Sequence, residues 1–319
     1  MINVEAIPVD VEEMRDWAIG YKAMHNLSWA DFGRQTGIPG GTLQPWCKGN
    51  YGGRMDHYAR LMFKFRQGVQ SRVEQLEGIP VDPGYFETPT STRIRGALAM
   101  ASTGEITVVA MGAGLGKTRT AIEYAGCVSP VYMITMDETS RRTPALITSI
   151  ERAVGLSCVK NWSNMVFQDI IRFLRNKRAT LIVDEAGQME YGGFEQLRAL
   201  HDATGVGICM MGNEELLTRI ESGKLRDQFA RLNSRIFQRL IQNTPEEGDI
   251  VAFCDAWKIF DPGIRKLLMD VALRPGSGAL RECRMIVRAA CMLASEDGGK
   301  LELAHVKWAF ESRAQRIIR

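Results

Sequence analysis

The chain has 319 residues, of which 24% are charged and 45% are hydrophobic, and its formal net charge at pH 7 is +3. This length allows two or three domains with separate hydrophobic cores, and because no run of about 18 apolar residues occurs, we expect neither a transmembrane helix nor a membrane partner. The acidic N-terminal stretch lacks the apolar core of a secretory signal, and the seven cysteines are dispersed without Cys-x-x-Cys spacing, so we expect no zinc site and reduced thiols in a cytoplasmic protein.

The chain divides into four segments by composition and periodicity. Residues 1–78 predict an all-helical N-terminal domain, and residues 79–92, which carry three prolines and several turn-forming residues, predict a linker. Residues 93–245 alternate strand and helix patterns, whereas residues 246–319 return to helices. The sequence therefore predicts an α/β core between two helical parts.

Residues 26–50 predict a helix-turn-helix within the N-terminal domain. A first helix is expected to begin after Ser28 and to end at Gly37, and a Gly-containing turn then leads into a second short helix. Pro45, inside the second helix, departs from this pattern because proline is tolerated only in the first turn of a helix.

This segment resembles the small phage-repressor type of helix-turn-helix, in which the second helix enters the major groove of DNA. Between Trp17 and Arg72, eight lysines and arginines stand against two aspartates, which is the charge expected of a phosphate-binding surface. A solvated helical surface, a structural bundle or a docking module would account for the same residues. The resemblance would place the following residues at the DNA, with the last of them near the phosphates: Thr42, Gln44, Lys48, Asn50 and Arg54.

Four short apolar runs in the third segment predict buried strands. They are separated by helical patterns, which is typical of a parallel sheet covered on both faces. The predicted strands are Ile106–Met111, Val131–Thr135, Thr180–Val183 and Gly207–Met211.

The first predicted strand runs into the sequence GAGLGKT, and a helical pattern follows. Glycines let such a loop aim its backbone N–H groups at phosphate oxygens, while Lys117 can reach the outer phosphates and Thr118 can hold Mg²⁺. The usual motif has glycine six residues before the lysine, where this chain has Met111, so Gly112 is expected to take over the turn. We therefore expect ATP and Mg²⁺ at the following residues: Gly112, Ala113, Gly114, Leu115, Gly116, Lys117, Thr118 and Arg119.

Polar side chains follow the third and fourth predicted strands. Asp184 can hold the magnesium ion, and Glu185 can act as the general base that polarises the attacking water. Asn213 follows the fourth strand, where it would orient that water, cap the next helix, or do both. Because the acidic pair belongs to the same predicted sheet as the phosphate loop, we expect the site to hydrolyse ATP.

Arginines recur in the later part of the chain. Arg231, Arg235 and Arg239 are spaced by four residues and would lie along one face of a helix, either as a solvated stripe or with one arginine supplied to the nucleotide of a neighbouring subunit. Arg281 opens a helix after a Gly-rich turn and would reach the nucleotide from a helical lid. Arg284, one turn further on, is expected at the surface.

The order of these motifs, GAGLGKT, LIVDE, MGN, RLNSRI and GALR, resembles that of the AAA+ ATPases, and within them the ATPases that serve transposition of bacteriophage Mu and related transposons. The resemblance covers nearly the whole chain. It implies an α/β fold: an AAA+ P-loop NTPase core with a parallel sheet, a C-terminal helical lid and an N-terminal all-α helix-turn-helix domain. The roles it implies are phosphate and magnesium binding for Lys117 and Thr118, hydrolysis for Asp184 and Glu185, γ-phosphate sensing for Asn213, the arginine finger for Arg235 and the lid sensor for Arg281.

The same resemblance implies that ATP-bound subunits assemble with one another into rings or helical filaments on double-stranded DNA, and that they deliver this target DNA to a transposase in the cytoplasm of a bacterial host. Arg141 and Arg142, in the loop after the second predicted strand, are the candidates for sequence-independent phosphate contacts, and Lys160 is a weaker one. The alternatives are a helicase-loader-type AAA+ ATPase and a helix-turn-helix DNA-binding regulator that uses ATP as a switch.

Overall fold

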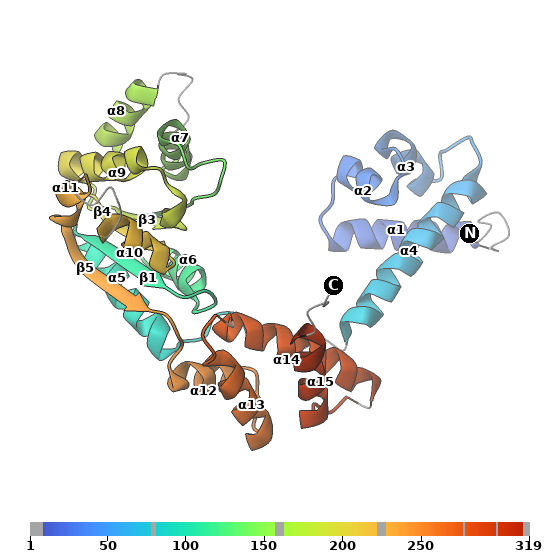
Figure 1. The fold of residues 1–319 in the computed structure, drawn as a ribbon. Helices are drawn as coiled ribbons and strands as arrows, with labels where there is room; N and C mark the ends of the chain where they lie inside the picture. The colour runs from blue at the N-terminus through green and yellow to red at the C-terminus, as the bar shows by residue number, and fades with distance from the viewer. Residues whose placement is uncertain are drawn as a thin grey trace, which may run out of the picture. The chain divides into compact units, whose positions relative to one another are not determined.

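Two compact units make up the chain, Met1–Pro80 and Val81–Arg319 (Figure 1). None of the helices in the described part of the chain is long and apolar enough to cross a membrane. The computed structural model describes residues 9–77, 81–156, 163–221, 228–276, 278–297 and 299–314.

The described part of the N-terminal unit, residues 9–77, contains four helices around a core of its own. Met14, Phe32, Trp46 and Met62, one from each helix, are each at most 1% exposed. Trp46 also donates its indole N–H to the carbonyl oxygen of Met55 (3.1 Å), which ties the third helix to the start of the fourth. The helices are α1 Val11–Met24, α2 Trp29–Thr36, α3 Gly40–Cys47 and α4 Met55–Glu77.

α2 begins and ends where the sequence predicts. The Oγ of Ser28 accepts the N–H of Asp31 (3.1 Å), and Gly37, with a left-handed φ of 74°, follows the last helical residue. α3 is an exception to the restriction of proline to the first turn of a helix, because Pro45 lies inside this eight-residue helix and beyond its first turn. The helix ends two residues later at Cys47.

Two glycines determine how closely α2 and α3 pack. A Cβ on Gly33 would lie 2.6 Å from the carbonyl oxygen of Ile38, and a Cβ on Gly40 would lie 2.8 Å from that of Trp29. Side-chain atoms do not approach backbone atoms so closely, because protein interiors are already close-packed. Any side chain at Gly33 or Gly40 would therefore push the two helices apart.

A five-stranded parallel sheet in the order β2-β3-β4-β1-β5 forms the centre of the second unit. The four predicted strands are confirmed, and β3 and β4 are each one residue longer than predicted. A fifth strand was not predicted. The strands are β1 Ile106–Met111, β2 Val131–Thr135, β3 Thr180–Asp184, β4 Gly207–Gly212 and β5 Ile236–Gln242.

The prediction of one helix carrying Arg231, Arg235 and Arg239 is wrong. Only Ala230–Asn233 are helical, as α11, and Ile236 opens β5, which pairs with β1. The four-residue spacing of the arginines suggested a helix, but the apolar and β-branched residues between them favour a strand where a sheet edge is available for pairing.

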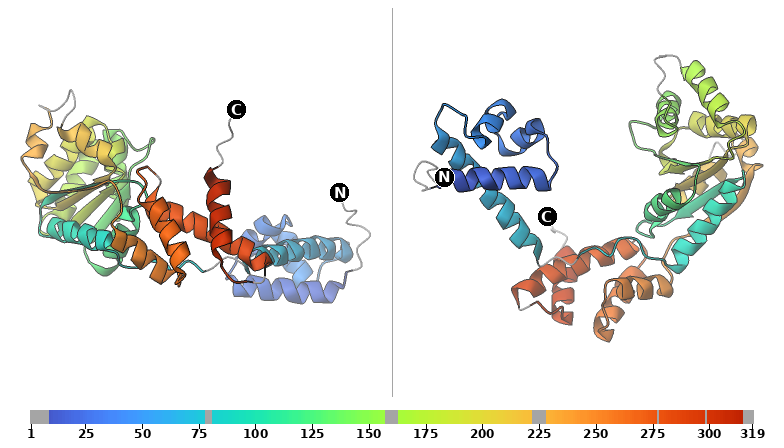
Figure 2. Two further views of the ribbon diagram at one scale, coloured as in Figure 1. Left: turned by 60° about the horizontal axis from the view of Figure 1, so that its bottom comes forward. Right: turned by 180° about the vertical axis from the view of Figure 1, so that it is seen from behind.

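Helices cover both faces of this sheet (Figures 1 and 2). Neighbouring residues of a strand point to opposite faces, so in β1 Val108 packs into the core on one face and Val109 into the core on the other. One face is covered by α5 Pro89–Ser102 and α6 Lys117–Cys127; the other is covered by α7 Thr143–Ala153, α8 Ser163–Leu174, α9 Tyr191–Thr204 and α10 Glu214–Glu221.

The last four helices share a separate core, and a buried carboxylate fixes them to α5. Asp249, which is fully buried, accepts the N–H (2.9 Å) and the hydroxyl (2.6 Å) of Thr90, and also the N–H of Glu246 (2.8 Å). The expected core and lid, residues 93–245 and 246–319, accordingly belong to one compact unit. The helices are α12 Glu247–Ala256, α13 Pro262–Ala272, α14 Ala279–Glu296 and α15 Leu303–Ala314.

The predicted linker, residues 79–92, is more than a connector, because α5 begins inside it at Pro89. Thr88 and Ser91 form a capping box, in which Thr88 Oγ1 accepts the Ser91 N–H (3.0 Å) and Ser91 Oγ accepts the Thr88 N–H (2.8 Å). Proline is well suited to the first position of a helix, where its missing N–H is not needed, so the last proline of the segment starts a helix.

Gly33→Ala should destabilise the N-terminal unit by about 1–3 kcal/mol, because the added methyl group would overlap the backbone of Ile38 and Gly40. Gly20→Ala, in the exposed middle of α1 with no atom within 4 Å of the new Cβ, is the control and should stabilise the unit by about 0.5–1 kcal/mol. Urea unfolding of both variants, followed by amide exchange in residues 11–77, measures the difference. Equal stability of the two variants would contradict the close packing of α2 on α3.

Candidate functional site

The loop between β1 and α6 passes close to the backbone on two sides. A Cβ on Gly112 would lie 2.3 Å from the carbonyl oxygen of Asn243, just after β5, and a Cβ on Gly114 would lie 1.8 Å from that of Gly278, just before α14. Gly114 also has a φ of 81°, which favours glycine. Glycine is therefore required at both positions.

Met111, which replaces the usual first glycine of the motif, is the last residue of β1 and is fully buried. The N–H of Gly112 donates to the carbonyl oxygen of Gln242 (2.9 Å), so the loop leaves the sheet at Gly112. Gly116, with a φ of 86°, precedes the first residue of α6. The free N–H groups at the start of this helix make the loop suitable for an anion.

Lys117 lies under the loop. Its Nζ donates to the carbonyl oxygens of Met111 (2.8 Å) and Gly112 (3.0 Å), and the residue is only 8% exposed. Burial lowers the pKa of Lys117, although the negative charges of Glu185 and Asp184 oppose the shift. The ammonium group is thus poorly solvated. A phosphate oxygen would be an anionic partner that compensates for the lost contact with water.

Thr118 and Asp184 are brought together at the end of β3. The Thr118 hydroxyl donates to Asp184 Oδ2 (2.6 Å), and Asp184 is 1% exposed. A hydroxyl and a carboxylate oxygen are the hard ligands that Mg²⁺ prefers, so this pair fits a magnesium ion that also binds phosphate oxygens. Glu185, next in the chain, has a left-handed φ of 52° and lies exposed at the rim.

A cavity of about 560 Å³ lies against the loop. Of the eight residues expected to bind nucleotide, all but Gly112 line it, and so do Glu185, Asn213 and Arg281. Asp184 lies behind Thr118 and does not line the cavity. The structure therefore brings the predicted phosphate loop, general base, polar sensor and lid arginine to one place.

The other wall of the cavity was not predicted. The segment before α5 contributes Tyr85 and Phe86, and α12 contributes Phe253 and Trp257. Phe86 meets Phe253 edge to face, with ring centroids 6.1 Å apart. Such an apolar wall suits a planar base. The capping-box pattern of Thr88 and Ser91 was the one local signal that this segment belongs to the folded unit.

Arg284 was expected at the surface, but it lines the cavity beside Arg281. Its Nε donates to Asp82 Oδ2 (2.6 Å), and Asp82 lines the same cavity. Arg284 is exposed, as expected, and it also faces the cavity because α14 starts against the phosphate loop.

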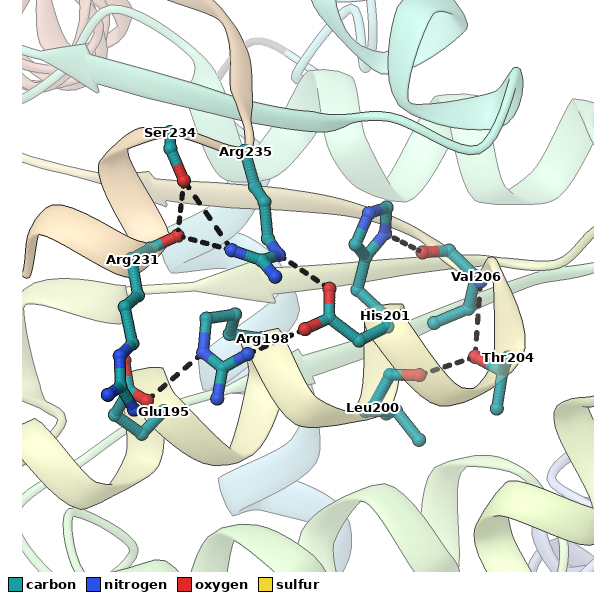
Figure 3. A network of polar contacts seen from close by, with 10 residues as sticks. Glu195, Arg198, Leu200, His201, Thr204, Val206, Arg231, Ser234 and Arg235 are labelled. Atoms are coloured by element: carbon teal, nitrogen blue, oxygen red, sulfur yellow. Dashed lines mark hydrogen bonds and ion pairs between the residues drawn. The ribbon is translucent and has the colours of Figure 1, made fainter.

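Arg235, the predicted arginine finger, is held within its own subunit (Figure 3). Its Nε donates to Asp202 Oδ1 (2.5 Å) and its Nη1 to the carbonyl oxygen of Arg231 (2.8 Å), while Arg198 binds the other oxygen of Asp202 (2.6 Å). Burial alone would raise the pKa of Asp202, but Arg235 and Arg198 outweigh it and hold this pKa below its usual range. Arg239 instead pairs with Glu221.

None of Arg231, Arg235 and Arg239 lines the cavity of this subunit. Within the described residues the guanidinium of Arg231 has no hydrogen bond or ion pair, and Figure 3 draws no contact from it. If one of these arginines acts on a nucleotide, that nucleotide must be bound by another subunit.

The predicted DNA-binding residues of the N-terminal unit lie on α3 and in the turn after it. Thr42 and Gln44 are half-buried, whereas Lys48, Asn50 and Arg54 are exposed. The exposure of these three side chains permits a contact with DNA. Exposure alone does not distinguish a DNA-binding surface from any other solvated surface.

The loop between β2 and α7 is organised by Asp137. Its Oδ1 accepts the N–H groups of Thr139 (2.9 Å) and Ser140 (2.8 Å), and hydrogen bonds from both residues lower its pKa to about 2. Arg141 is paired with Glu138 (2.5 Å) and Glu190 (3.2 Å), so much of its charge is neutralised.

Arg142, next to it, is exposed and makes no side-chain ion pair within the part of the chain that the structure describes. It is the better candidate of the two for a phosphate contact. Lys160 lies outside the described residues.

Two known families match different parts of the chain. The family described as Mu B transposition protein, C terminal, matches residues 234–312, and the AAA domain matches residues 100–220. The chain is 28% identical over 277 residues to the ATP-dependent target DNA activator B of Escherichia phage Mu, covering 86% of this chain and 87% of that protein. It is 25% identical over 233 residues to the Mu-like prophage FluMu DNA transposition protein B of Haemophilus influenzae, covering 72% and 80% respectively.

Solved structures with the same fold include the ORC2 protein of Aeropyrum pernix, with a TM-score of 0.54 and 15% identity over 71% of this chain and 69% of that one. A structure of Drosophila ORC bound to DNA gives a TM-score of 0.53 and 14% identity over 78% and 66%. At these identities the likeness shows the fold alone. Together with the sequence similarities, it shows that the chain has an AAA+ P-loop fold and resembles the ATP-dependent target DNA activator B of phage Mu.

Proposed function

We propose that this protein is an ATP-dependent, largely sequence-nonspecific DNA-binding ATPase that oligomerises on duplex DNA and delivers target DNA to a transposase, in the cytoplasm of a bacterial host. The observation that carries the proposal is the phosphate-loop cavity with Lys117, Thr118 and Glu185 in a chain that matches target DNA activator B along most of its length. A nucleotide site alone would fit many functions, and the similarity to target DNA activator B favours a function in transposition.

Each residue of the site has a defined task in this proposal. Lys117 and the N–H groups at the start of α6 bind the phosphates, while Thr118 and Asp184 hold Mg²⁺, which neutralises charge on the phosphates. Glu185 accepts the proton of the attacking water, which Asn213 orients. The aromatic wall around Phe86 and Trp257 excludes water from the base.

DNA binding would depend on ATP because the DNA contacts are weak in one subunit. Arg142 and the exposed cations of the N-terminal unit offer few phosphate contacts per subunit. Phosphate contacts carry no base sequence information, and their number sets both affinity and salt dependence. Subunits joined through ATP would add their contacts along the duplex, so affinity rises steeply with assembly.

The proposal is tested by fluorescence anisotropy of a labelled random-sequence duplex titrated with protein in ATP, in ADP and without nucleotide, at two salt concentrations. We expect cooperative, salt-sensitive binding with ATP alone, and none for Lys117→Ala, which lacks the phosphate-binding ammonium group. Binding that ignores the nucleotide, or that requires one particular sequence, would contradict the proposal and favour an ATP-switched regulator.

Glu185→Gln should bind ATP normally and hydrolyse it about 10²- to 10⁴-fold more slowly, because the amide cannot accept a proton from water. Since hydrolysis releases the subunits, this variant should stay on DNA after free ATP is removed. Phosphate release and the lifetime of the DNA complex are measured together. An unchanged hydrolysis rate would remove Glu185 from the role of general base.

Arg235→Ala should abolish most of the ATPase activity that DNA-bound oligomers show, with a loss of about 10²-fold or more, because an arginine finger stabilises charge in the transition state. Asp202→Asn is the matched control: it breaks the ion pair of Arg235 but keeps the arginine, so activity should be retained.

Mixing Arg235→Ala with Lys117→Ala should restore part of this activity, because each variant supplies what the other lacks across the subunit interface. No restoration, or a similar loss in Arg231→Ala alone, would move the finger away from Arg235.

A further inference from the structure

The charges around the nucleotide cavity are mixed, which is unexpected for a site that receives a triphosphate. Four cationic side chains and two carboxylates line it among the described residues: Lys117, Arg119, Arg281, Arg284, Asp82 and Glu185. Glu185 has a proposed role in hydrolysis, whereas Asp82 has none. A carboxylate in the lining of the cavity repels phosphate groups bound there, so its presence requires an explanation.

Asp82 is held in place by neighbours on both of its oxygens. Arg284 Nε donates to Oδ2 (2.6 Å), and the N–H of Gly84 donates to Oδ1 (3.0 Å). Burial opposes ionisation, but these two hydrogen bonds and the nearby charge of Arg119 keep the pKa of Asp82 below its usual range. The carboxylate is therefore ionised and fixed at neutral pH.

The two arginines that Asp82 influences come from the two sides of the cavity. Arg119 lies in the first turn of α6, directly after the phosphate loop, and Arg284 lies in α14, one turn after Arg281. Without Asp82, Arg284 would face the cavity as an unpaired cation, and the charge of Arg119 would no longer be offset by a nearby carboxylate, so a polyphosphate would be attracted more strongly.

We propose that the carboxylate of Asp82 competes with the phosphates of the nucleotide for Arg284, neutralises this arginine and so weakens ATP binding. This inference rests on the proposed function, because it requires that the cavity bind ATP. The Asp82–Arg284 pair contributes no net charge to the cavity. Removing either member alone should therefore change affinity in opposite directions, and removing both should restore it.

The test is isothermal titration calorimetry of the full chain with MgATP and with adenosine. Asp82→Asn should bind ATP about three- to tenfold more tightly, a modest gain because both side chains of the pair are about two-fifths exposed, at 41% and 44%. Arg284→Gln should bind ATP more weakly by a similar factor, and the double variant should return to within about twofold of the unaltered chain. Adenosine affinity should not change in any of them, because adenosine carries no phosphate.

Asp270→Asn is the matched control, because Asp270 is exposed on α13 and does not line the cavity, so its loss makes the same change in net charge elsewhere. It should leave ATP affinity unchanged. The gain in Asp82→Asn should also shrink at about 0.5 M salt, since salt screens exposed charges.

Two results would overturn the inference while leaving the proposed function intact. Weaker binding of both ATP and adenosine by Asp82→Asn would mean that the carboxylate binds the ribose or closes the cavity, and an unchanged ATP affinity would mean that it is only a surface ion pair. Failure of the unaltered chain to bind ATP would instead overturn the proposed function and this inference with it.

Discussion

The site depends on three stretches of backbone that approach one another where β1 ends. The phosphate loop runs so close to the residue after β5 and to the residue before α14 that no Cβ fits at Gly112 or Gly114. This contact starts α14 against the loop, and so its first two turns deliver Arg281 and Arg284 to the same cavity as Lys117. Asp249 makes a second attachment, because a buried carboxylate that lost its three donors would be strongly destabilising. Between them, these contacts build one cavity from the sheet and the helices that follow it.

The polar groups of the site are paired with one another. Lys117 donates to the carbonyl oxygens of Met111 and Gly112, Thr118 donates to Asp184, and Arg284 donates to Asp82. A nucleotide with its Mg²⁺ would compete with the Thr118–Asp184 and Arg284–Asp82 contacts, so its affinity is a difference between two sets of interactions and not the sum of the new ones. Burial lowers the pKa of Lys117, so its surroundings disfavour a charge that a phosphate would compensate.

Local signals predicted one side of this site and missed the other. Strands β1 to β4 were found because each is a short apolar run between helical patterns, and the loop was found because its glycines, Lys117 and Thr118 are contiguous. The wall formed by Phe86 and Trp257 is assembled from distant segments, and no local pattern marks either residue as facing a ligand. β5 was missed for a different reason: pairing with β1 decides its conformation, and that tertiary contact outweighs the spacing of its arginines.

Arg235 is held within its own subunit by a weak ion pair, although its proposed role is at the nucleotide of a neighbouring subunit. Arg235 is about one-third exposed, and ion pairs at such positions contribute little, about 0–1 kcal/mol. Asp202 also binds Arg198, so withdrawal of Arg235 would not leave this carboxylate without a partner. The ion pair therefore holds the guanidinium in place, but little free energy is needed to break it. A resting position of this kind suits an arginine that must leave its own subunit to act on a neighbour, because a deeply buried pair would hold it too firmly.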